Sequence, residues 1–481
     1  MVHDNIEGIV VTFNSVLLMI SVQFIHDLHL LCLRKVVRQN LLKSEEAKRR
    51  KKKVRVRFSD FVSSISPTMF RRMFRMPYEC FMLLCRNIED GVGRDEFLGE
   101  EYIEKELNSG KKKGRMKAAH MEASGGYISG EVKVALTLRL LAGASYLDIS
   151  YIFDIFYTST FRLFHHVCQE WLCQDWVSEY VLEKYLGNPE KLYQISKEFT
   201  AKGRSNGILG GIIGALDGWL VKIRSPSFVR DGVRNAAAFF SRKGFFALNV
   251  QVIFDRNKKV LWRSMNSKGS EHDSSSFKDT SLYKNLTEIF GEGKDNPLCY
   301  DGIQLYLVGD SAYALRPFLL CPYDGAEPGT PEDVFNFMLS SNRIFVECTF
   351  GEIDARFGIF WRPLAFDLAK DKFVIDSCMR VHNFLVDYRM EKNADGDWEA
   401  DIAYYDSECL SFIIDNPEIC VGAYGNGSIG MGRPTIDEAI MRESGSILRD
   451  HLRDRMASLN LKRVTREWNM TSCHHTVESS N

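Results

Sequence analysis

The spacing of hydrophobic residues changes about two fifths of the way along the chain. Between residues 58 and 200, apolar side chains recur every three or four positions, and Pro67 and Pro77 interrupt the run, which predicts short helices. After Gly203, runs rich in β-branched and apolar residues predict strands. The change predicts a domain boundary at about residues 195–208.

Within the helical part, residues 131–173 predict three short helices joined by tight turns. The first ends at Gly143, and the second opens with Ser145 and Asp148 in capping-box spacing. The third begins at about Thr158, after a Thr/Ser cap. This succession favours a helix-turn-helix, with an ordinary helical bundle as the alternative.

In a helix-turn-helix the third helix enters the major groove of DNA. Thr160, Arg162 and His165 or His166 would then face the bases. In an ordinary bundle, the two histidines would lie on a solvated surface.

The second half predicts a mixed α/β layer fold, because strands come first and helices are interleaved later. A helix is expected at about residues 341–358. The expected strands are residues 210–217, 219–224, 245–255, 259–265 and 304–310.

The charge of the chain is unevenly distributed, although its formal total is −1. Residues 48–57 read KRRKKKVRVR, a run typical of nuclear-import signals or of arms that follow phosphate backbones, with a solvated linker as the alternative. Residues 1–57 are therefore interpreted as an apolar extension and a basic arm. Residues 391–481 are interpreted as an acidic loop and a helical tail, for which a dimer contact is one alternative.

Two sequence features argue against other classes of protein. The 12 cysteines include no C-x-x-C pair, which indicates reduced thiols rather than a zinc knuckle or a redox motif. Residues 8–25 carry no charge, but Asn14, Ser15 and Gln23 weaken a membrane-spanning interpretation. A packed helix or a wrongly chosen start codon is the favoured explanation.

Candidate chemistry lies where two expected strands end in aspartate, at Asp217 and Asp310. A carboxylate at the end of a buried strand is costly to desolvate unless a cation or hydrogen bonds compensate it. The helix that follows supplies a third carboxylate, Glu347. Oxygen ligands suit Mg²⁺ or Mn²⁺, and two such ions can catalyse in-line phosphodiester displacement.

The motifs around these acids resemble those of the PIF/Harbinger transposases and their domesticated nuclease relatives. They read G-A-L-D-G-W at 214–219, S-R-K-G-F-F-A-L-N-V-Q at 241–251, G-S-E-H-D at 269–273, L-V-G-D-S-A-Y at 307–313 and R-I-F-V-E-C-T-F-G at 343–351. Cys348 and Thr349 depart from the basic residue or asparagine that many relatives carry after the glutamate. The resemblance covers about residues 205–390.

The resemblance implies an RNase H-like DDE nuclease domain at residues 205–390, behind a helical DNA-binding domain at 58–200. Asp217, Asp310 and Glu347 would form the catalytic triad and hold Mg²⁺ or Mn²⁺. The implied activity is cleavage at the terminal inverted repeats of a transposon and joining of the ends to target DNA. The resemblance also implies a Myb/SANT-like partner protein and action in the nucleus.

Three further residues are expected near the site. His272 and Asp273 could orient phosphate or support a ligand, or Asp273 could cap a helix that begins at Ser274–Ser276. Arg343 could contact DNA phosphate or pair with a catalytic carboxylate.

Two other functions compete with the transposase interpretation. One is a domesticated, catalytically silent protein that binds DNA or acts as a scaffold. The other is an RNase H-like nuclease that acts on RNA or branched DNA. Metal dependence separates the first from an enzyme, and substrate competition separates the second from a transposase.

Overall fold

The computed structural model describes residues 56–98, 128–202, 207–291, 298–394 and 436–462, which fall in one compact unit. The predictions for the apolar extension, for residues 48–55 of the basic run and for the acidic loop beyond residue 394 lie outside these residues. None of the helices in the described ranges is long and apolar enough to cross a membrane.

A five-stranded mixed sheet forms the centre of the second half, in the order β3-β2-β1-β6-β7. β1, β2 and β3 pair antiparallel, whereas β6 and β7 continue the sheet in parallel. The strands are β1 (Ile212–Lys222), β2 (Ala247–Phe254), β3 (Val260–Lys268), β6 (Tyr306–Val308) and β7 (Leu319–Leu320). A separate hairpin joins β4 (Cys299–Tyr300) to β5 (Ile303–Gln304). The predicted mixed α/β fold is confirmed.

One strand prediction is wrong. Residues 210–217 and 219–224 were expected to form two strands, but β1 runs through Gly218 without a break. Gly218 pairs with Gln251 of β2, and its neighbours on both sides keep the same register. Asp217 therefore lies in the middle of a long strand and not at its end.

The helices of the first half are α2 (Phe58–Ser63), α3 (Pro67–Phe74), α4 (Tyr78–Val92), α5 (Arg94–Leu98), α8 (Gly130–Leu141), α9 (Tyr146–Ile152), α10 (Tyr157–His166), the π-helix η1 (Val167–Leu172), α11 (Leu182–Tyr185) and α12 (Pro189–Lys202). Those of the second half are α13 (Phe228–Asp231), the 3-10 helix η2 (Ala236–Phe239), α14 (Asp273–Lys278), α15 (Ser281–Ile289), α16 (Pro331–Ser341), α17 (Ile344–Arg356), the 3-10 helix η3 (Gly358–Trp361), α18 (Leu368–Ala394) and α20 (Ile436–Ser458). The helix expected at 341–358 corresponds to α17.

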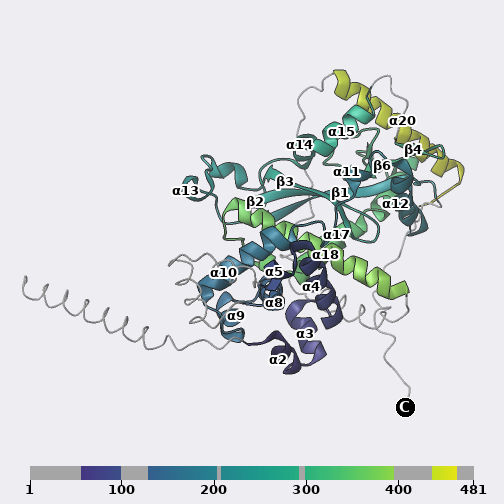
Figure 1. Ribbon diagram of the computed structural model, residues 1–481. Coiled ribbons are helices and arrows are strands. Elements are labelled where there is room, and N and C mark those ends of the chain that lie inside the picture. Colours follow the sequence, from purple (N-terminus) through teal and green to yellow (C-terminus); the bar gives the residue numbers. More distant parts are fainter. Residues whose placement is uncertain (1–55, 99–127, 203–206, 292–297, 395–435, 463–481) are drawn as a thin grey trace, which may run out of the picture. The chain divides into compact units, whose positions relative to one another are not determined.

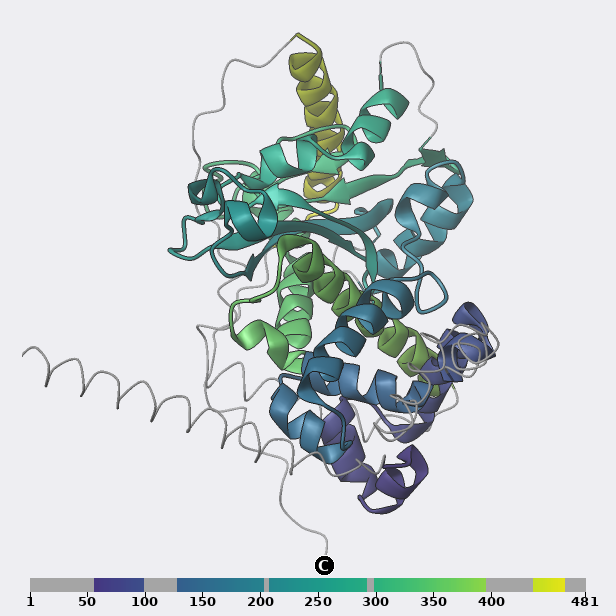
Figure 2. The ribbon, with the colours of Figure 1, turned by 60° about the vertical axis from the view of Figure 1, so that its left-hand side comes forward.

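Two hydrophobic cores cover the two faces of the sheet. On one face, Phe277 of α14 and Leu282 of α15 pack with Leu216 and Ile253 of the strands. The other core is larger and extends from the sheet through α17 and α18 into the helical first half. Figure 1 shows α18 between the sheet and the helices α4, α5, α8 and α10 of the first half, and Figure 2 shows the same arrangement from another side.

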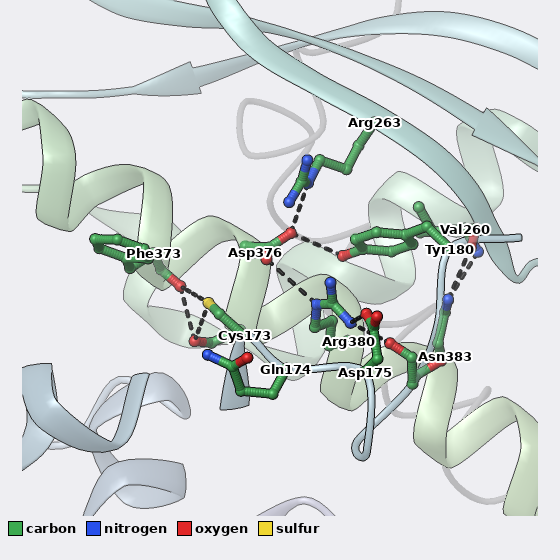
Figure 3. Close-up of polar contacts among 12 residues, drawn as sticks. Cys173, Gln174, Asp175, Tyr180, Val260, Arg263, Phe373, Asp376, Arg380 and Asn383 are labelled. Carbon is green, nitrogen blue, oxygen red and sulfur yellow. Dashed lines mark hydrogen bonds and ion pairs between the residues drawn. The ribbon is translucent and has the colours of Figure 1, made fainter. Parts of the chain in front are cut away.

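A buried polar cluster, here called the Asp376 latch, joins α18, β3 and the segment after η1 (Figure 3). The Asp376 carboxylate accepts hydrogen bonds from Tyr180 at 2.9 Å, from Nε of Arg263 at 2.7 Å and from Nε of Arg380 at 3.3 Å. Arg380 also donates to Asp175 at 2.9 Å. Burial alone would raise the pKa of Asp376, but the hydrogen bond and charge of Arg263 and the charge of Arg380 lower it.

The latch has a consequence for the domain organisation. The chain passes from α12 to β1 close to the predicted boundary at 195–208. However, the helical segment and the sheet share the larger core and the latch. Within the described ranges they form one packed unit.

The three helices expected at 131–173 correspond to α8, α9 and α10. Ser145 caps α9 by accepting from the backbone N–H of Leu147 at 3.2 Å. α10 begins at Tyr157 without a side-chain cap, so the predicted Thr/Ser cap is wrong.

The structure contradicts two of the predicted DNA contacts on α10. Thr160 is fully buried and donates to the carbonyl of Phe156. His165 is half-buried with its ring against Phe366, and burial lowers its pKa to about 4. Both side chains lie on the side of the helix that packs on the protein, whereas Arg162 and His166 are exposed.

The carboxy-terminal helix α20 packs on α16. Met456 and Leu452 are buried in the larger core, and Arg453 pairs with Glu332 of α16 at 3.0 Å. The apolar side of this helix is therefore used within the chain.

Candidate functional site

The register of β1 and β6 brings the first two predicted acids together. These parallel strands pair Ala215 with Val308, which is the last residue of β6. Asp217 and Asp310 each follow two residues after that pair, where β6 has ended and β1 pairs only with β2 on its other side. Both carboxylates therefore line one pocket at the end of β6.

Asp217 is buried with little compensation for its charge. It is 7% exposed, accepts one hydrogen bond from the backbone N–H of Gly218 at 2.9 Å, and lies 3.6 Å from the guanidinium of Arg343. Burial raises the pKa of Asp217 to about 7; Arg343 opposes this shift, and the Asp310 carboxylate adds to it. A second positive charge nearby would stabilise the ionised form of Asp217.

Asp310 has a similar environment. It accepts from the backbone N–H of Ala312 at 3.0 Å in the turn after β6. Burial raises its pKa, Arg343 opposes the shift, and the nearby Asp273 carboxylate adds to it. Arg343 thus faces both acids, as one of its two predicted roles requires.

Asp273 is the third carboxylate of the pocket. Its Oδ1 accepts hydrogen bonds from the side-chain amides of Asn249 at 2.9 Å and Gln251 at 3.1 Å, and its Oδ2 lies 3.8 Å from Arg242. The predicted helix cap is wrong, because α14 begins at Asp273 itself and His272 occupies the capping position. The side chain turns instead to the sheet.

Gly218 makes room for this arrangement. A Cβ at this position would overlap Oδ1 of Asp273 and lie 2.9 Å from Nε2 of Gln251. The sheet register explains the crowding, because Gln251 pairs with Gly218 and Asn249 pairs with Leu220. A glycine in the middle of β1 therefore allows the aspartate of α14 to approach the strand.

The remaining lining of the pocket comes from the loop between β3 and α14 and from the connection between β1 and β2. His272 is exposed at its edge. Arg242 brings a positive charge to the same opening. The full lining is Asp217, Gly218, Leu220, Arg242, Asn249, Gly269, Ser270, Glu271, His272, Asp273 and Asp310.

The structure does not bring Glu347 into the pocket lining. Glu347 is exposed in the first turn of α17. Its connection with the site runs through Arg343, which precedes it by one turn and contacts Asp217. Of the three predicted triad acids, Asp217 and Asp310 meet in the pocket and Glu347 stands outside it.

No three His, Cys, Asp or Glu side chains in the described ranges are close enough together to hold a metal ion as they stand. The donor set nevertheless suits a hard divalent cation, since Asp217, Asp310 and Asp273 all offer oxygen ligands. The raised pKa values of Asp217 and Asp310 show that their charges lack sufficient compensation from the protein. The residues therefore fit such an ion once their side chains draw together.

Sequence reasoning assigned no role to Asn249, Gln251 or Tyr313. The hydroxyl of Tyr313 donates to Gln251 at 2.7 Å, and Gln251 donates to Asn249 at 2.8 Å as well as to Asp273. Burial raises the pKa of Tyr313 well above its ordinary range, which keeps the hydroxyl protonated as a donor. Two amides at alternate positions of the otherwise apolar strand β2 were the signal in the sequence.

Comparison with known proteins finds a family match over the segment that carries this site. Residues 216–384, which contain Asp217, Asp310 and Glu347, match the family model described as DDE superfamily endonuclease. This segment is therefore similar in sequence to DDE superfamily endonucleases.

One relative is Protein ALP1-like of Arabidopsis thaliana, which is 28% identical over 149 residues. The match covers 30% of this chain and 36% of that protein, so the chain spans about a third of the relative's length. No solved structure matches the chain. The family match and this relative confirm the resemblance to Harbinger-type DDE transposases.

Proposed function

We propose that this chain is a divalent-metal-dependent DNA endonuclease whose reaction takes place in the pocket lined by Asp217, Asp310 and Asp273. The observation that carries the proposal is the shared register of Asp217 and Asp310, which places two incompletely compensated carboxylates at one end of the sheet. The match to DDE superfamily endonucleases supports it. We assign the sheet to the RNase H-like fold, as three antiparallel strands continued by two parallel ones suit that class.

Asp217 and Asp310 would bind Mg²⁺ or Mn²⁺ through their carboxylate oxygens. When bound, such ions activate a water or a 3′-hydroxyl and stabilise charge on the phosphoryl group. Asn249 and Gln251 hold Asp273 in a fixed orientation beside them. Arg242 and His272, at the opening, are suited to bind phosphate oxygens of the DNA strand.

Two carboxylates compete for the third ligand position. Family resemblance assigns it to Glu347, which would have to turn toward Asp217 past Arg343. The pocket instead offers Asp273, which faces the other two acids already. Arg343 contacts Asp217 at the side where α17 begins, and its charge offsets the repulsion between the acids.

The test is nicking of supercoiled DNA with Mg²⁺ or Mn²⁺ by the purified chain. Asp217→Asn and Asp310→Asn should each lower the nicking rate about a thousandfold, because ligand loss removes stabilisation of the transition state. Glu190→Gln, which alters an exposed carboxylate on α12, should change nothing. Asp273→Asn and Glu347→Gln identify the third ligand. The variant whose nicking rate falls as far as that of Asp310→Asn has lost a ligand of the metal ion. If all variants cut as fast as wild type, another protein or another site is responsible.

A second candidate function is a catalytically silent protein that binds DNA. It is favoured by the ion pair between Arg343 and Asp217 and by the exposure of Glu347, which together leave the predicted triad unassembled. Folded wild-type protein that binds DNA but neither nicks it nor gains thermal stability with Mn²⁺ would establish this function.

The finer parts of the proposal rest on the family resemblance. They are recognition of terminal inverted repeats, joining of the cut end to target DNA, a Myb/SANT-like partner protein, assembly of several copies and action in the nucleus. A helix-turn-helix at α8–α10 belongs with them, with Arg162 and His166 as the exposed candidates for base contact.

A further inference from the structure

The connection between β1 and β2, residues 223–246, carries an exposed apolar tip. Its short helix α13 has no buried residue, and Phe228 and Val229 in it are 63% and 97% exposed. Figure 1 shows α13 beyond the end of the sheet, on the side of β2 and β3. Two adjacent apolar side chains in water gain nothing for the isolated chain and indicate a contact surface.

Hydrogen bonds fix the position of the tip relative to the rest of the fold. The Asp231 carboxylate accepts from the backbone N–H of Ser227 at 2.9 Å and from that of Leu368, the first residue of α18, at 3.0 Å. Burial would raise the pKa of Asp231, but these hydrogen bonds and Arg230 lower it, so the carboxylate stays charged. Phe228 and Val229 are thus presented on a turn fastened to the core.

The same connection is strongly basic. Arg224, Arg234 and Arg242 are exposed, and the charge of Asp231 is already matched by Arg230 at 3.0 Å. Arg242 also lines the pocket, 3.8 Å from Asp273. The cationic surface therefore continues from the carboxylate pocket along the connection that carries the tip.

The depth of the pocket creates a need for such a tip. Asp217 lies deep in the pocket, with only 7% of its surface exposed. Stacking and pairing of the bases keep the backbone of an undistorted duplex regular, so a strand that is locally unstacked can bring its phosphodiester closer to this carboxylate. Apolar side chains that enter between base pairs unstack them and bend the duplex.

We infer that residues 223–246 bind the DNA duplex beside the phosphodiester to be cut, with Phe228 and Val229 inserted between bases and the arginines on the phosphates. The inference rests on the proposed function, because it places the cut in the Asp217 pocket. A nucleic acid fits better than a protein partner, since protein interface cores are depleted of charge and this surface concentrates one sign.

The test compares two substrates and two matched double variants. The substrates are a fully paired duplex and the same duplex with a run of mismatched base pairs at its centre. Both carry 2-aminopurine at the same central position. F228S/V229S removes the tip. I447S/L459S removes two exposed apolar side chains away from the helices proposed to bind DNA: Ile447 on α20 is 66% exposed, and Leu459 directly after that helix is 56% exposed.

In Mn²⁺, F228S/V229S should nick the paired duplex about tenfold more slowly than wild type and the mismatched duplex at nearly the wild-type rate, because pre-opened DNA no longer needs unstacking. I447S/L459S should behave as wild type on both. Arg234→Gln should weaken binding to both duplexes equally and reduce its salt dependence. An equal loss by F228S/V229S on both substrates would overturn the inference.

Binding in Ca²⁺ separates this inference from the proposed function. Wild-type protein should raise the 2-aminopurine fluorescence of the paired duplex, and F228S/V229S should not. If this difference in fluorescence is seen but wild type nicks DNA under no condition, the nuclease function is rejected and the role of the tip in opening DNA is retained. Normal nicking with no fluorescence change in wild type would reject the tip. A change in self-association caused by F228S/V229S, with unchanged DNA opening, would identify the tip as a protein interface and also overturn the inference.

Discussion

Asp217 and Asp376 are buried to a similar extent, with 7% and 4% of their surface exposed, yet the protein moves their pKa values in opposite directions. Asp376 receives hydrogen bonds from Tyr180, Arg263 and Arg380, and its pKa is lowered despite burial. Asp217 receives one backbone hydrogen bond and a guanidinium at 3.6 Å, and its pKa rises to about 7. The opposite pKa shifts therefore come from the hydrogen-bond and charge partners of the two acids and not from how deeply they are buried.

The comparison distinguishes a buried acid that holds the fold from one that awaits a ligand. Every strong interaction of Asp376 comes from the chain itself, across three elements that are distant in sequence. Asp217 shares its pocket with three other acidic residues, Glu271, Asp273 and Asp310, so the chain leaves part of its charge for another cation to balance. Neither sequence position nor burial alone would separate these two roles.

The largest effect on stability is expected at the latch. Asp376→Ala leaves Arg263 and Arg380 without their buried counter-charge and should lower the free energy of unfolding by about 3–5 kcal/mol, measured by urea denaturation. Asp175→Ala is the matched control, because Asp175 pairs with the same Arg380 but its side chain is 71% exposed. It should cost less than about 1 kcal/mol. Equal losses in the two variants would mean that burial does not set the strength of this cluster.

A smaller effect of opposite sign is expected at the pocket. The folded-state pKa of Asp217 is raised from 3.8 to about 7, so its contribution to stability is present below pH 3.8 and is lost as the pH rises toward 7. With EDTA present, Asp217→Asn should therefore become more stable than wild type by about 2–4 kcal/mol between pH 4 and pH 8. Urea unfolding across this range measures the difference. A pH-independent difference would show that Asp217 is already balanced within the protein.

Adding Mn²⁺ at pH 8 sharpens the same comparison. Wild type should gain thermal stability as the ion compensates the acids, and Asp217→Asn should gain little. Asp376→Ala should keep its gain in metal-induced stability even though its starting stability is lower. Loss of the gain in Asp376→Ala alone would place the metal at the latch.

The smallest effect concerns the space beside Asp217. Gly218→Ala should push Asp273 away from the strand and weaken Mn²⁺ affinity about tenfold, as expected when a residue that orients the ligands is displaced. Gly187→Ala is the control, since a Cβ there meets nothing. Isothermal titration measures both. An unchanged Mn²⁺ affinity in Gly218→Ala would show that Asp273 does not contribute to the metal site.

Much of the sheet could be predicted from the sequence, because its strands are continuous apolar runs bounded by turns. Asp217 and Asp310 could also be singled out in advance, since the first lies within such a run and the second follows one. The role of Asp273 could not, as its partners Asn249 and Gln251 meet it only through the register of β1 and β2. That register is a property of the folded sheet.

The errors on α10 have a similar origin. Helical spacing identified the helix but not which of its sides is covered. Thr160 is buried, and the ring against His165 belongs to Phe366, two hundred positions further along the chain. A contact between such distant residues leaves no local mark in the sequence. The position of Glu347 was missed for the same reason, because its distance from the pocket depends on how α17 packs.

The pairing of Ala215 with Val308 also bears on how such proteins can change over evolutionary time. Both acids are counted from this one pair, so their separation depends on two residues of each strand and not on the length of chain between them. Connections between the strands can lengthen, shorten or acquire new surfaces while the two oxygen donors stay level. A single residue inserted between Ala215 and Asp217 would shift one donor to the opposite face of the sheet, which makes this short stretch the least tolerant of insertion.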